Sequence, residues 1–312
     1  MKAVMPGHIS HSRKGFILVS VLMLGVLLIS CATAFTLFVR RQARSSGGQL
    51  MKLSARSMAH VIVSSIISLT AELSSQANSD SPAHRWYQPF VFALPGMGIW
   101  VVQVTPLDDK IPLRNIFLPD GNTMRRELSE PWRQMWDKLH HRDLEMITLD
   151  FLDKNTRPRV GSREEKYYLN RPPYDLSEML ILSPDITPEI LYGSGGEMGL
   201  ADYCTVYSDG KINLNVAPVH VMELIPGLDA GGVAQSIAEH RTENAITSLS
   251  DIRKIPGASA RTSNQIMNIA GFKSRYFSIR LESAGGSENG GAMSFSVIYD
   301  RTAKQIVKWE ES

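Results

Sequence analysis

Cysteine is almost missing from this chain, with two residues among 312. A disulfide-rich secreted scaffold is therefore excluded. The chain also lacks the excess of glycine and proline, and the large net charge, that mark collagen-like and disordered sequences: it has 23 Gly, 16 Pro and a net charge of +2, and 43% of its residues are hydrophobic. What remains is the composition of a folded protein with the length of about two domains.

Acidic residues are absent from positions 1–44, which hold six Lys and Arg. Subtracting these six from the 33 basic residues leaves 27 against 31 acidic residues in positions 45–312, a net charge of −4. A domain that binds duplex DNA or a membrane surface carries an excess of Lys and Arg. The body of this protein has no such excess, so the composition argues against both classes.

Charge is also absent from the 24 residues between Phe16 and Val39. As a helix this segment is about 36 Å long, which is enough to cross a hydrocarbon core of about 30 Å. We therefore predict a transmembrane helix over 16–39. Three basic residues precede the segment and three follow it, so charge gives no orientation in the membrane.

Three kinds of N-terminal processing are compatible with this segment. Cys31, after Leu-Ile-Ser, fits a lipoprotein signal, and the small residues 32–34 fit signal-peptide cleavage before Phe35. A polar leader over 1–15, ending at Gly15 and followed directly by Phe16, resembles a type IV prepilin-like leader, which is cut between these two residues. In that last case the whole apolar helix is kept.

The sequence after Val39 favours the prepilin-like interpretation. Apolar residues continue at helical spacing and predict one buried stripe of an amphipathic helix, made of Met51, Ala55, Met58, Ile62, Ile66, Leu69 and Leu73. Gly47 and Gly48 mark a potential kink between the two halves. A membrane helix that continues into an amphipathic helix is the layout of a pilin.

The rest of the chain predicts an α+β fold. Strands are expected over 99–105, with a turn back towards Ile111 and Leu113, and as an antiparallel meander over 276–281, 293–299 and 305–309; helices are expected over 128–139 and 144–152. We therefore predict a pilin-like domain interrupted by a large helical insertion. Its predicted parts are a leader (1–15), a transmembrane helix (16–39), an amphipathic helix with the first strands (40–119), the helical insertion (120–272) and the C-terminal strands (273–312).

A repeated turn lies within residues 211–271. Ile-Pro-Gly occurs with Pro226 and Gly227 and again 30 residues later with Pro256 and Gly257, each time between two helix-like stretches. This pattern predicts tandem helix-hairpin-helix motifs. Such motifs often bind nucleic acid, but here Asp229 and Ser259 replace the usual second glycine, and the segment has five basic and five acidic residues. A structural or protein-binding role is favoured over nucleic-acid binding.

Several segments in order resemble the K-type minor pseudopilin of the bacterial type II secretion system, the general secretion pathway protein K family. They are the prepilin-like leader, the Asn-Leu-Asn stretch in 211–218 with its Pro-Gly turn at 226–227, and the acidic segment 150–155 with Gly161, Glu164, Tyr167 and Tyr168 after it. Counted from Phe16, position five is Ser20, where ordinary pilins carry Glu. The resembling family also lacks this Glu. The departures are Phe151 for a Trp, Asn155 for a third Asp, and an incomplete Gly-Ala-Glu.

The resemblance implies a subunit at the tip of a pseudopilus, above I- and J-type partners. It also implies processing and methylation by a prepilin peptidase, contact with the inner-membrane secretion platform, and a single-pass inner-membrane location with a periplasmic C-terminal domain. A calcium site is implied as well, and Asp150, Asp153, Asn155 and Glu164 offer the hard oxygen ligands that Ca²⁺ prefers. No catalytic motif such as Gly-x-Ser-x-Gly, His-Glu-x-x-His or Cys-x-x-Cys occurs, so an enzyme is not expected.

Two other classes stay open on the sequence alone. One is a DNA-binding minor pilin of a DNA-uptake or type IV pilus system, which would use the hairpins. The other is a membrane-anchored lipoprotein with a helix-hairpin-helix binding domain.

Overall fold

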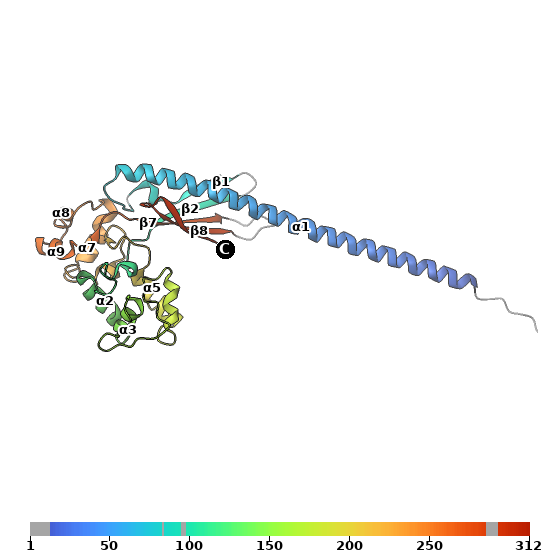
Figure 1. Cartoon of the computed structure of the whole chain (residues 1–312). Coiled ribbons are helices and arrows are strands. Elements are labelled where there is room, and N and C mark those ends of the chain that lie inside the picture. The colour runs from blue at the N-terminus through green and yellow to red at the C-terminus, as the bar shows by residue number, and fades with distance from the viewer. Residues whose placement is uncertain (1–12, 83, 95–97, 285–292) are drawn as a thin grey trace, which may run out of the picture. The chain divides into compact units, whose positions relative to one another are not determined.

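The computed structural model describes residues 13–82, 84–94, 98–284 and 293–312 (Figure 1). The described residues fall into two compact units: the helix up to Met58, and the described residues from Ala59 onward. Of the leader predicted over 1–15, residues 1–12 lie outside the described residues.

The first helix, α1, spans Arg13–Gln76. It is helical through Gly47 and Gly48, where a kink was predicted. Of the predicted buried stripe, Ala55, Ile62 and Ile66 are buried. The prediction was wrong for Met58 and Leu69, which are 36% and 39% exposed. Ala59 and Val63 are buried instead, so the packed face is rotated around the helix by about 40° from the predicted one.

An antiparallel sheet forms the second layer of the larger unit. Its strands are β1 (Phe90–Leu94), β2 (Gly98–Pro106), β7 (Tyr276–Ala284), β8 (Ser294–Asp300) and β9 (Gln305–Glu311), in the order β1-β2-β7-β8-β9 (Figure 1). Along β2, Trp100, Val102 and Val104 are buried at alternate positions, as the period of a strand requires. The predicted strands and the C-terminal meander are confirmed, and β1 was missed.

Residues 107–275 are inserted between two neighbouring strands. The chain leaves the sheet at the end of β2 and returns at the start of β7, which pairs directly with β2. The helices of this insertion are α2 (Arg126–Lys138), α3 (Leu144–Leu152), α4 (Pro188–Tyr192), α5 (Leu200–Tyr203), α6 (Val219–Met222), α7 (Val233–Glu243), α8 (Leu249–Ile252) and α9 (Ala260–Ile266). Short 3₁₀ segments lie at Arg85–Tyr87 (η1), Leu113–Asn115 (η2) and Leu176–Leu182 (η3).

Two short parallel pairs also lie in the insertion: β3 (Ile111–Pro112) with β4 (Cys204–Thr205), and β5 (Ile212–Asn213) with β6 (Ala270–Gly271). The first pair corrects the predicted turn from β2 back towards Ile111 and Leu113. The actual partner strand of β3 lies more than 90 residues further along the chain, so no local pattern could indicate it.

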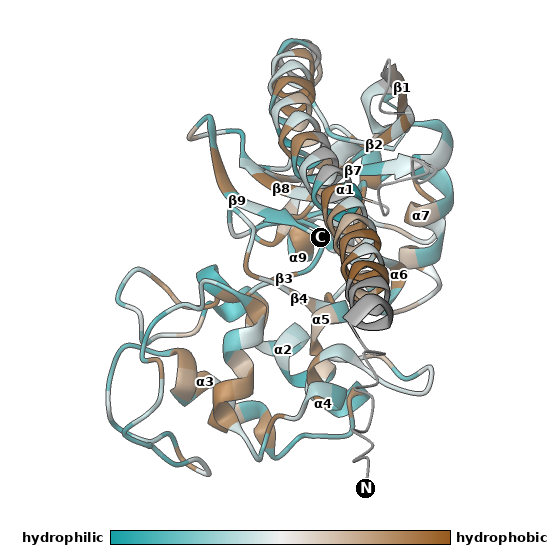
Figure 2. Ribbon diagram, turned by 90° about the vertical axis from the view of Figure 1, so that its right-hand side faces the viewer, coloured by the Kyte–Doolittle hydropathy of each residue, from teal (hydrophilic) through white to brown (hydrophobic). Residues whose placement is uncertain are grey.

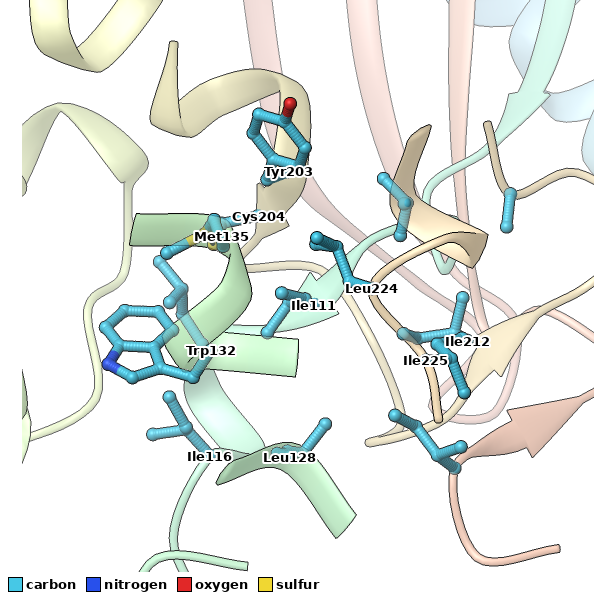
Figure 3. Packing of buried hydrophobic residues seen from close by; sticks show 14 of the residues in the cluster. Ile111, Ile116, Leu128, Trp132, Met135, Tyr203, Cys204, Ile212, Leu224 and Ile225 are labelled. Atoms are coloured by element: carbon cyan, nitrogen blue, oxygen red, sulfur yellow. Dashed lines mark hydrogen bonds between the residues drawn. The ribbon is translucent and has the colours of Figure 1, made fainter. Parts of the chain in front are cut away.

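The core of the insertion is built on one face of α2. Leu128, Trp132 and Met135 recur at helical spacing and are fully buried (Figure 3). Met135 Sδ lies 3.4 Å from Cys204 Sγ, and Trp132 Nε1 donates a hydrogen bond to the carbonyl of Glu145 in α3. The helical middle of the chain therefore has a hydrophobic core that fixes the ends of α2 and α3.

Two buried aspartates fasten the base of the insertion. Asp108 accepts three backbone N–H hydrogen bonds, from Asp209, Arg275 and Tyr276, each at 2.9 Å. Asp209 lies inside the insertion just before β5, and Arg275 and Tyr276 lie where the chain leaves it, so one carboxylate holds both segments to the end of β2.

Asp80, which follows α1, accepts a hydrogen bond from the backbone N–H of Ser274 at 2.6 Å. It also accepts two from the guanidinium of Arg301, at 3.0 and 2.9 Å. Both aspartates are 0% exposed. The second carboxylate thus ties the end of the α1 segment to the turn between β8 and β9.

Candidate functional site

The N-terminal unit presents a long apolar surface. Within the described residues, Val21–Gln42 has a mean hydropathy of 2.4 and none of it is buried in the protein (Figure 2). Leu22, Phe35 and Phe38 are 68%, 68% and 64% exposed. A solvated helix with so much apolar surface is unfavourable in water, and its length suffices to cross a bilayer. By its length and composition the helix is therefore a candidate membrane anchor.

A second apolar stretch, Gly48–Glu72, has a lower mean hydropathy of 1.3 and is 28% buried. Its buried positions are those of the packed face of α1. This stretch is accordingly the amphipathic continuation of the helix.

The predicted processing residues lie at the start of α1. Gly15, Phe16 and Ser20 all belong to its first two turns. Cys31, the alternative lipidation site, is a free cysteine exposed in the middle of the same helix. Cleavage at Cys31 would remove 18 residues that are helical here.

The predicted acidic residues gather where α3 ends, around a residue that the sequence analysis did not single out. The guanidinium of Arg159 lies between Asp150 and Asp153: its Nε is 3.1 Å from Asp150 Oδ1, and its Nη2 is 2.6 Å from Asp153 Oδ2. Both carboxylates are 0% exposed, and the backbone N–H of Arg159 also donates to Asp150 Oδ2 at 2.8 Å. Arg159 lies four residues after the acidic segment 150–155 and has Arg157 and Arg163 beside it, so no signal in the sequence distinguished it.

Asn155 has a different part in this cluster. Its Nδ2 donates to Asp153 Oδ2 at 2.9 Å, and its Oδ1 accepts the backbone N–H of Arg157 at 2.8 Å. Its amide therefore stabilises the turn after α3 and holds the Asp153 carboxylate in place.

Several buried oxygens of the cluster receive no hydrogen bond in the described part of the chain. They are Oδ1 of Asp153, both carboxylate oxygens of Glu164, Oδ1 of Asn170, and Oδ1 of Asp150, which has only the ion pair with Arg159 Nε. Burial raises the pKa of Asp153 and of Glu164, and the charge of Asp150 raises both further. Arg159 acts in the opposite direction on the pKa of Asp153. Two carboxylates, of Asp150 and Asp153, thus share one guanidinium, and Glu164 makes no ion pair within the described residues.

These donors are of the chemical type that Ca²⁺ prefers, but their arrangement is centred on the arginine. Among the described residues no group of three or more His, Cys, Asp or Glu is placed to hold a metal ion. The structure brings Asp150, Asp153 and Asn155 together and places Glu164 within their electrostatic influence.

The two Pro-Gly turns lie between pairs of short helices. Pro226 and Gly227 separate α6 from α7, and Pro256 and Gly257 separate α8 from α9. Both glycines have positive φ, +94° and +81°, which favours glycine.

Each turn packs against the second helix of the other repeat. A Cβ at Gly227 would lie 2.8 Å from Gln265 Oε1, and one at Gly257 would lie 3.2 Å from Val233 Cγ2. The N–H of Gly227, which could otherwise face a phosphate, already donates to Asp229 Oδ1 at 2.9 Å. The contacts of the turns are thus largely with the protein itself.

A long N-terminal apolar helix followed by an antiparallel sheet fits the pilin-like fold. The structure is similar to a chain in the crystal structure of the GspK-GspI-GspJ complex from the enterotoxigenic Escherichia coli type 2 secretion system, with a TM-score of 0.61. The match covers 85% of this chain and 99% of that chain, at 16% sequence identity. At this identity the likeness establishes a shared fold. No protein-family model and no curated protein sequence matches this chain.

Proposed function

We propose that this protein is a minor pseudopilin of a type II secretion system, and specifically its K-type subunit. The shared fold with a chain of a secretion-system complex carries the proposal. The exposed apolar segment of α1 supports it, because a pseudopilin packs by such a helix, and so does the order of the sequence segments that resemble the K-type family. Its partners would be the I- and J-type pseudopilins, the prepilin peptidase and the inner-membrane secretion platform.

The proposed subunit works by assembly rather than by catalysis. Its helix enters the membrane and the bundle of neighbouring pilin helices. Ordinary pilins carry a Glu at position five, whose charge is costly in the bilayer unless it meets a neighbour's N-terminal amine. Ser20 cannot make that pair with a subunit ahead of it, and the 169-residue insertion 107–275 is too bulky for a filament shaft. Both features support a position at the tip, where the subunit would start the pseudopilus.

The first test is the intact mass and N-terminal sequence of the protein extracted from membranes. The proposal expects a start at Phe16 with one added methyl group. A start at lipid-bearing Cys31, or at Phe35, would overturn it, because the helix that packs into a filament would then be lost. A C-terminal alkaline phosphatase fusion, active only in the periplasm, checks the proposed single-pass orientation.

Partner binding gives a second test of the same function. Co-expression with an I-type and a J-type pseudopilin should yield a complex that survives size-exclusion chromatography. Ser20→Glu should leave this complex intact, because position five is remote from the periplasmic domain in sequence. The same change should reduce secretion of folded exoproteins if the tip position depends on the missing carboxylate.

We propose further that residues 211–271 form tandem helix-hairpin-helix motifs with a structural role. The mutual packing of the two turns and the occupied N–H of Gly227 support this role. The purified protein should show no salt-dependent binding to duplex DNA at low ionic strength. Such binding would favour the DNA-uptake pilin instead.

We also propose that the cluster of Asp150, Asp153, Asn155 and Glu164 takes Ca²⁺ beside Arg159. The buried oxygens without hydrogen bonds support this, because such groups cost free energy unless a cation or donor meets them. Calcium added to EDTA-treated protein should raise the thermal midpoint, and Glu164→Gln should remove the rise. An unchanged midpoint in the unaltered protein contradicts the calcium proposal and leaves the pseudopilin proposal untouched.

A further inference from the structure

The helical insertion contains a pocket of about 640 Å³ whose charged lining is entirely basic. Its four charged lining residues are Arg114, Arg125, Lys154 and Arg171. They come from η2, the residue before α2, the segment after α3 and the segment before η3. Residues 45–312 carry a net charge of −4, so this cluster of positive charge is a local feature of the pocket.

Two of these cations are already neutralised and two are not. Arg125 pairs with Glu127 at 2.8 Å, and Arg171 pairs with Glu178 at 3.0 Å. Arg114 and Lys154 make no ion pair within the described residues. The pocket therefore keeps two positive charges with no protein carboxylate against them.

Asp153, between the lining residues Leu152 and Lys154, is 0% exposed, and its Oδ2 is bound by Arg159 and Asn155. The other acidic side chain flanked by lining residues is Asp120, between Pro119 and Gly121. Its carboxylate accepts hydrogen bonds from the backbone of Asn122 and Thr123 and from the Thr123 hydroxyl. These bonds commit it to its own turn rather than to the pocket.

Three of the four basic side chains, those of Arg114, Arg125 and Arg171, are held in place by neighbouring groups. The ring of Tyr174 lies 4.4 Å from the guanidinium carbon of Arg171 and 5.7 Å from that of Arg114, within the range of cation–π contacts. Arg125 is fixed by the carbonyls of Asn115 and Gly210, at 3.3 and 2.7 Å. Ordering these long side chains before a ligand arrives lowers the entropic cost of binding.

The remainder of the lining is largely apolar. Phe117, Leu118, Leu152 and Pro172 lie between the cations. A small inorganic anion would fill only a fraction of the volume, since a water molecule occupies about 30 Å³. A ligand that matches both features carries a carboxylate and an apolar group side by side.

We propose that this pocket binds an acidic segment of a partner polypeptide, with its carboxylates at Arg114 and Lys154 and an apolar side chain against Phe117 and Leu152. Charge complementarity and the mixed lining select such a segment over a basic or purely polar one. The proposal rests on the pocket alone, so it stands or falls independently of the pseudopilin function.

The test uses the full chain in a neutral detergent and a fluorescein-labelled hexapeptide of alternating glutamate and leucine. Fluorescence anisotropy should detect binding that weakens as salt is raised. Two control peptides are used: one has lysine in place of each glutamate, and the other has serine in place of each leucine. Each should bind at least about tenfold more weakly, because each lacks one of the two matched features.

The matched pair of variants is Arg114→Gln with Lys154→Gln, and Arg126→Gln with Lys166→Gln. Both pairs remove two exposed positive charges from the insertion, but only the first pair lines the pocket. The first should weaken peptide binding about tenfold and the second less than twofold, as for charge-assisted contacts against remote charges. Equal thermal midpoints confirm that both are folded.

Three outcomes overturn the proposal. The first is no binding of the acidic peptide, and the second is equal weakening by both pairs of variants, which indicates a general effect of charge. The third is displacement of the peptide by millimolar inorganic phosphate from the unaltered pocket, which indicates a site for a small anion.

Discussion

The larger unit contains two sets of carboxylates whose aspartates are fully buried. The two sets differ in how many of their carboxylate oxygens accept a hydrogen bond. At the base of the insertion, every oxygen of Asp80 and Asp108 accepts a hydrogen bond. In the cluster after α3, oxygens of Asp150, Asp153 and Glu164 receive none in the described part of the chain. A saturated carboxylate fixes chain segments, whereas an unsaturated one retains the capacity to bind. The first set is therefore structural, and the second is where a ligand would be sought.

The largest expected effect comes from breaking the saturated set. Asp108→Ala would leave three backbone N–H groups without their acceptor: that of Tyr276, which is buried, and those of Asp209 and Arg275, which are partly buried. We expect the free energy of unfolding to fall by about 3–5 kcal/mol, because each orphaned donor costs on the order of 1–3 kcal/mol and the costs overlap. Urea denaturation followed by tryptophan fluorescence in neutral detergent measures it.

The matched control is Asp137→Ala. Asp137 is an exposed aspartate of α2 that, within the described residues, makes one ion pair, with Arg142 at 3.4 Å. Its loss should cost under about 1 kcal/mol. A similar loss in both variants would mean that the hydrogen bonds at the base of the insertion contribute nothing special.

A smaller effect is expected from breaking the unsaturated set. Arg159→Gln removes the one cation between Asp150 and Asp153, whose side chains are fully buried while the arginine is 26% exposed. We expect a loss of about 2 kcal/mol, below the full cost of breaking a buried pair, because backbone and amide donors remain. The thermal midpoint of EDTA-treated protein measures it.

Adding calcium then distinguishes two cases: a cluster whose oxygens can bind a cation, and a cluster that only lacks some hydrogen bonds. If the cluster binds Ca²⁺, the ion should restore more stability to Arg159→Gln than it adds to the unaltered protein; saturation at 100 times the dissociation constant is worth about 2.7 kcal/mol. Arg157→Gln, two residues away and exposed, is the control, and Mg²⁺ is the control ion. No recovery in calcium would show that only an arginine fits there.

The regular elements of both regions could be predicted from sequence. The periodicity of Leu128, Trp132 and Met135 specified α2, and alternation specified β2, because each depends on residues within one turn or pleat. The five-residue strand β1 was too short to show alternation. The packed face of α1 was misplaced at Met58 and Leu69, since two adjacent stripes there are about equally apolar.

The two carboxylate sets were unequally predictable for the same reason. Asp150 and Asp153 were found because the segment that resembles the K-type family includes them together with Asn155 and Glu164, all within 15 residues of one another. Asp108 could not be found, because its donors are backbone groups 101, 167 and 168 residues away, which leave no trace in side-chain pattern. Arg159 was overlooked although it lies only four residues after the acidic segment 150–155, because acidic ligands were sought and the competing cation was not.

The smallest effect is expected at a third, solvent-exposed carboxylate, Asp175, which accepts a hydrogen bond from Lys308 of β9 at 2.7 Å. That bond is the main reason why the pKa of Asp175 falls from 3.8 to about 2. A depressed pKa means stability that is present above about pH 4 and lost as pH falls towards 2. Because Lys308 is 34% and Asp175 41% exposed, solvent limits the pair to at most about 1 kcal/mol.

Asp175→Asn should therefore lower the thermal midpoint slightly at pH 7 and by the same amount at pH 5, and the difference from the unaltered protein should close between pH 4 and 2. The amide still offers an oxygen to the N–H of Ser177, so the start of η3 is kept and only the charge is lost. A difference that persisted at pH 2 would mean that shape, and not charge, joins the insertion to β9. In that case, the number of hydrogen bonds that each carboxylate accepts, rather than its charge alone, would be the property that distinguishes the three carboxylate sites.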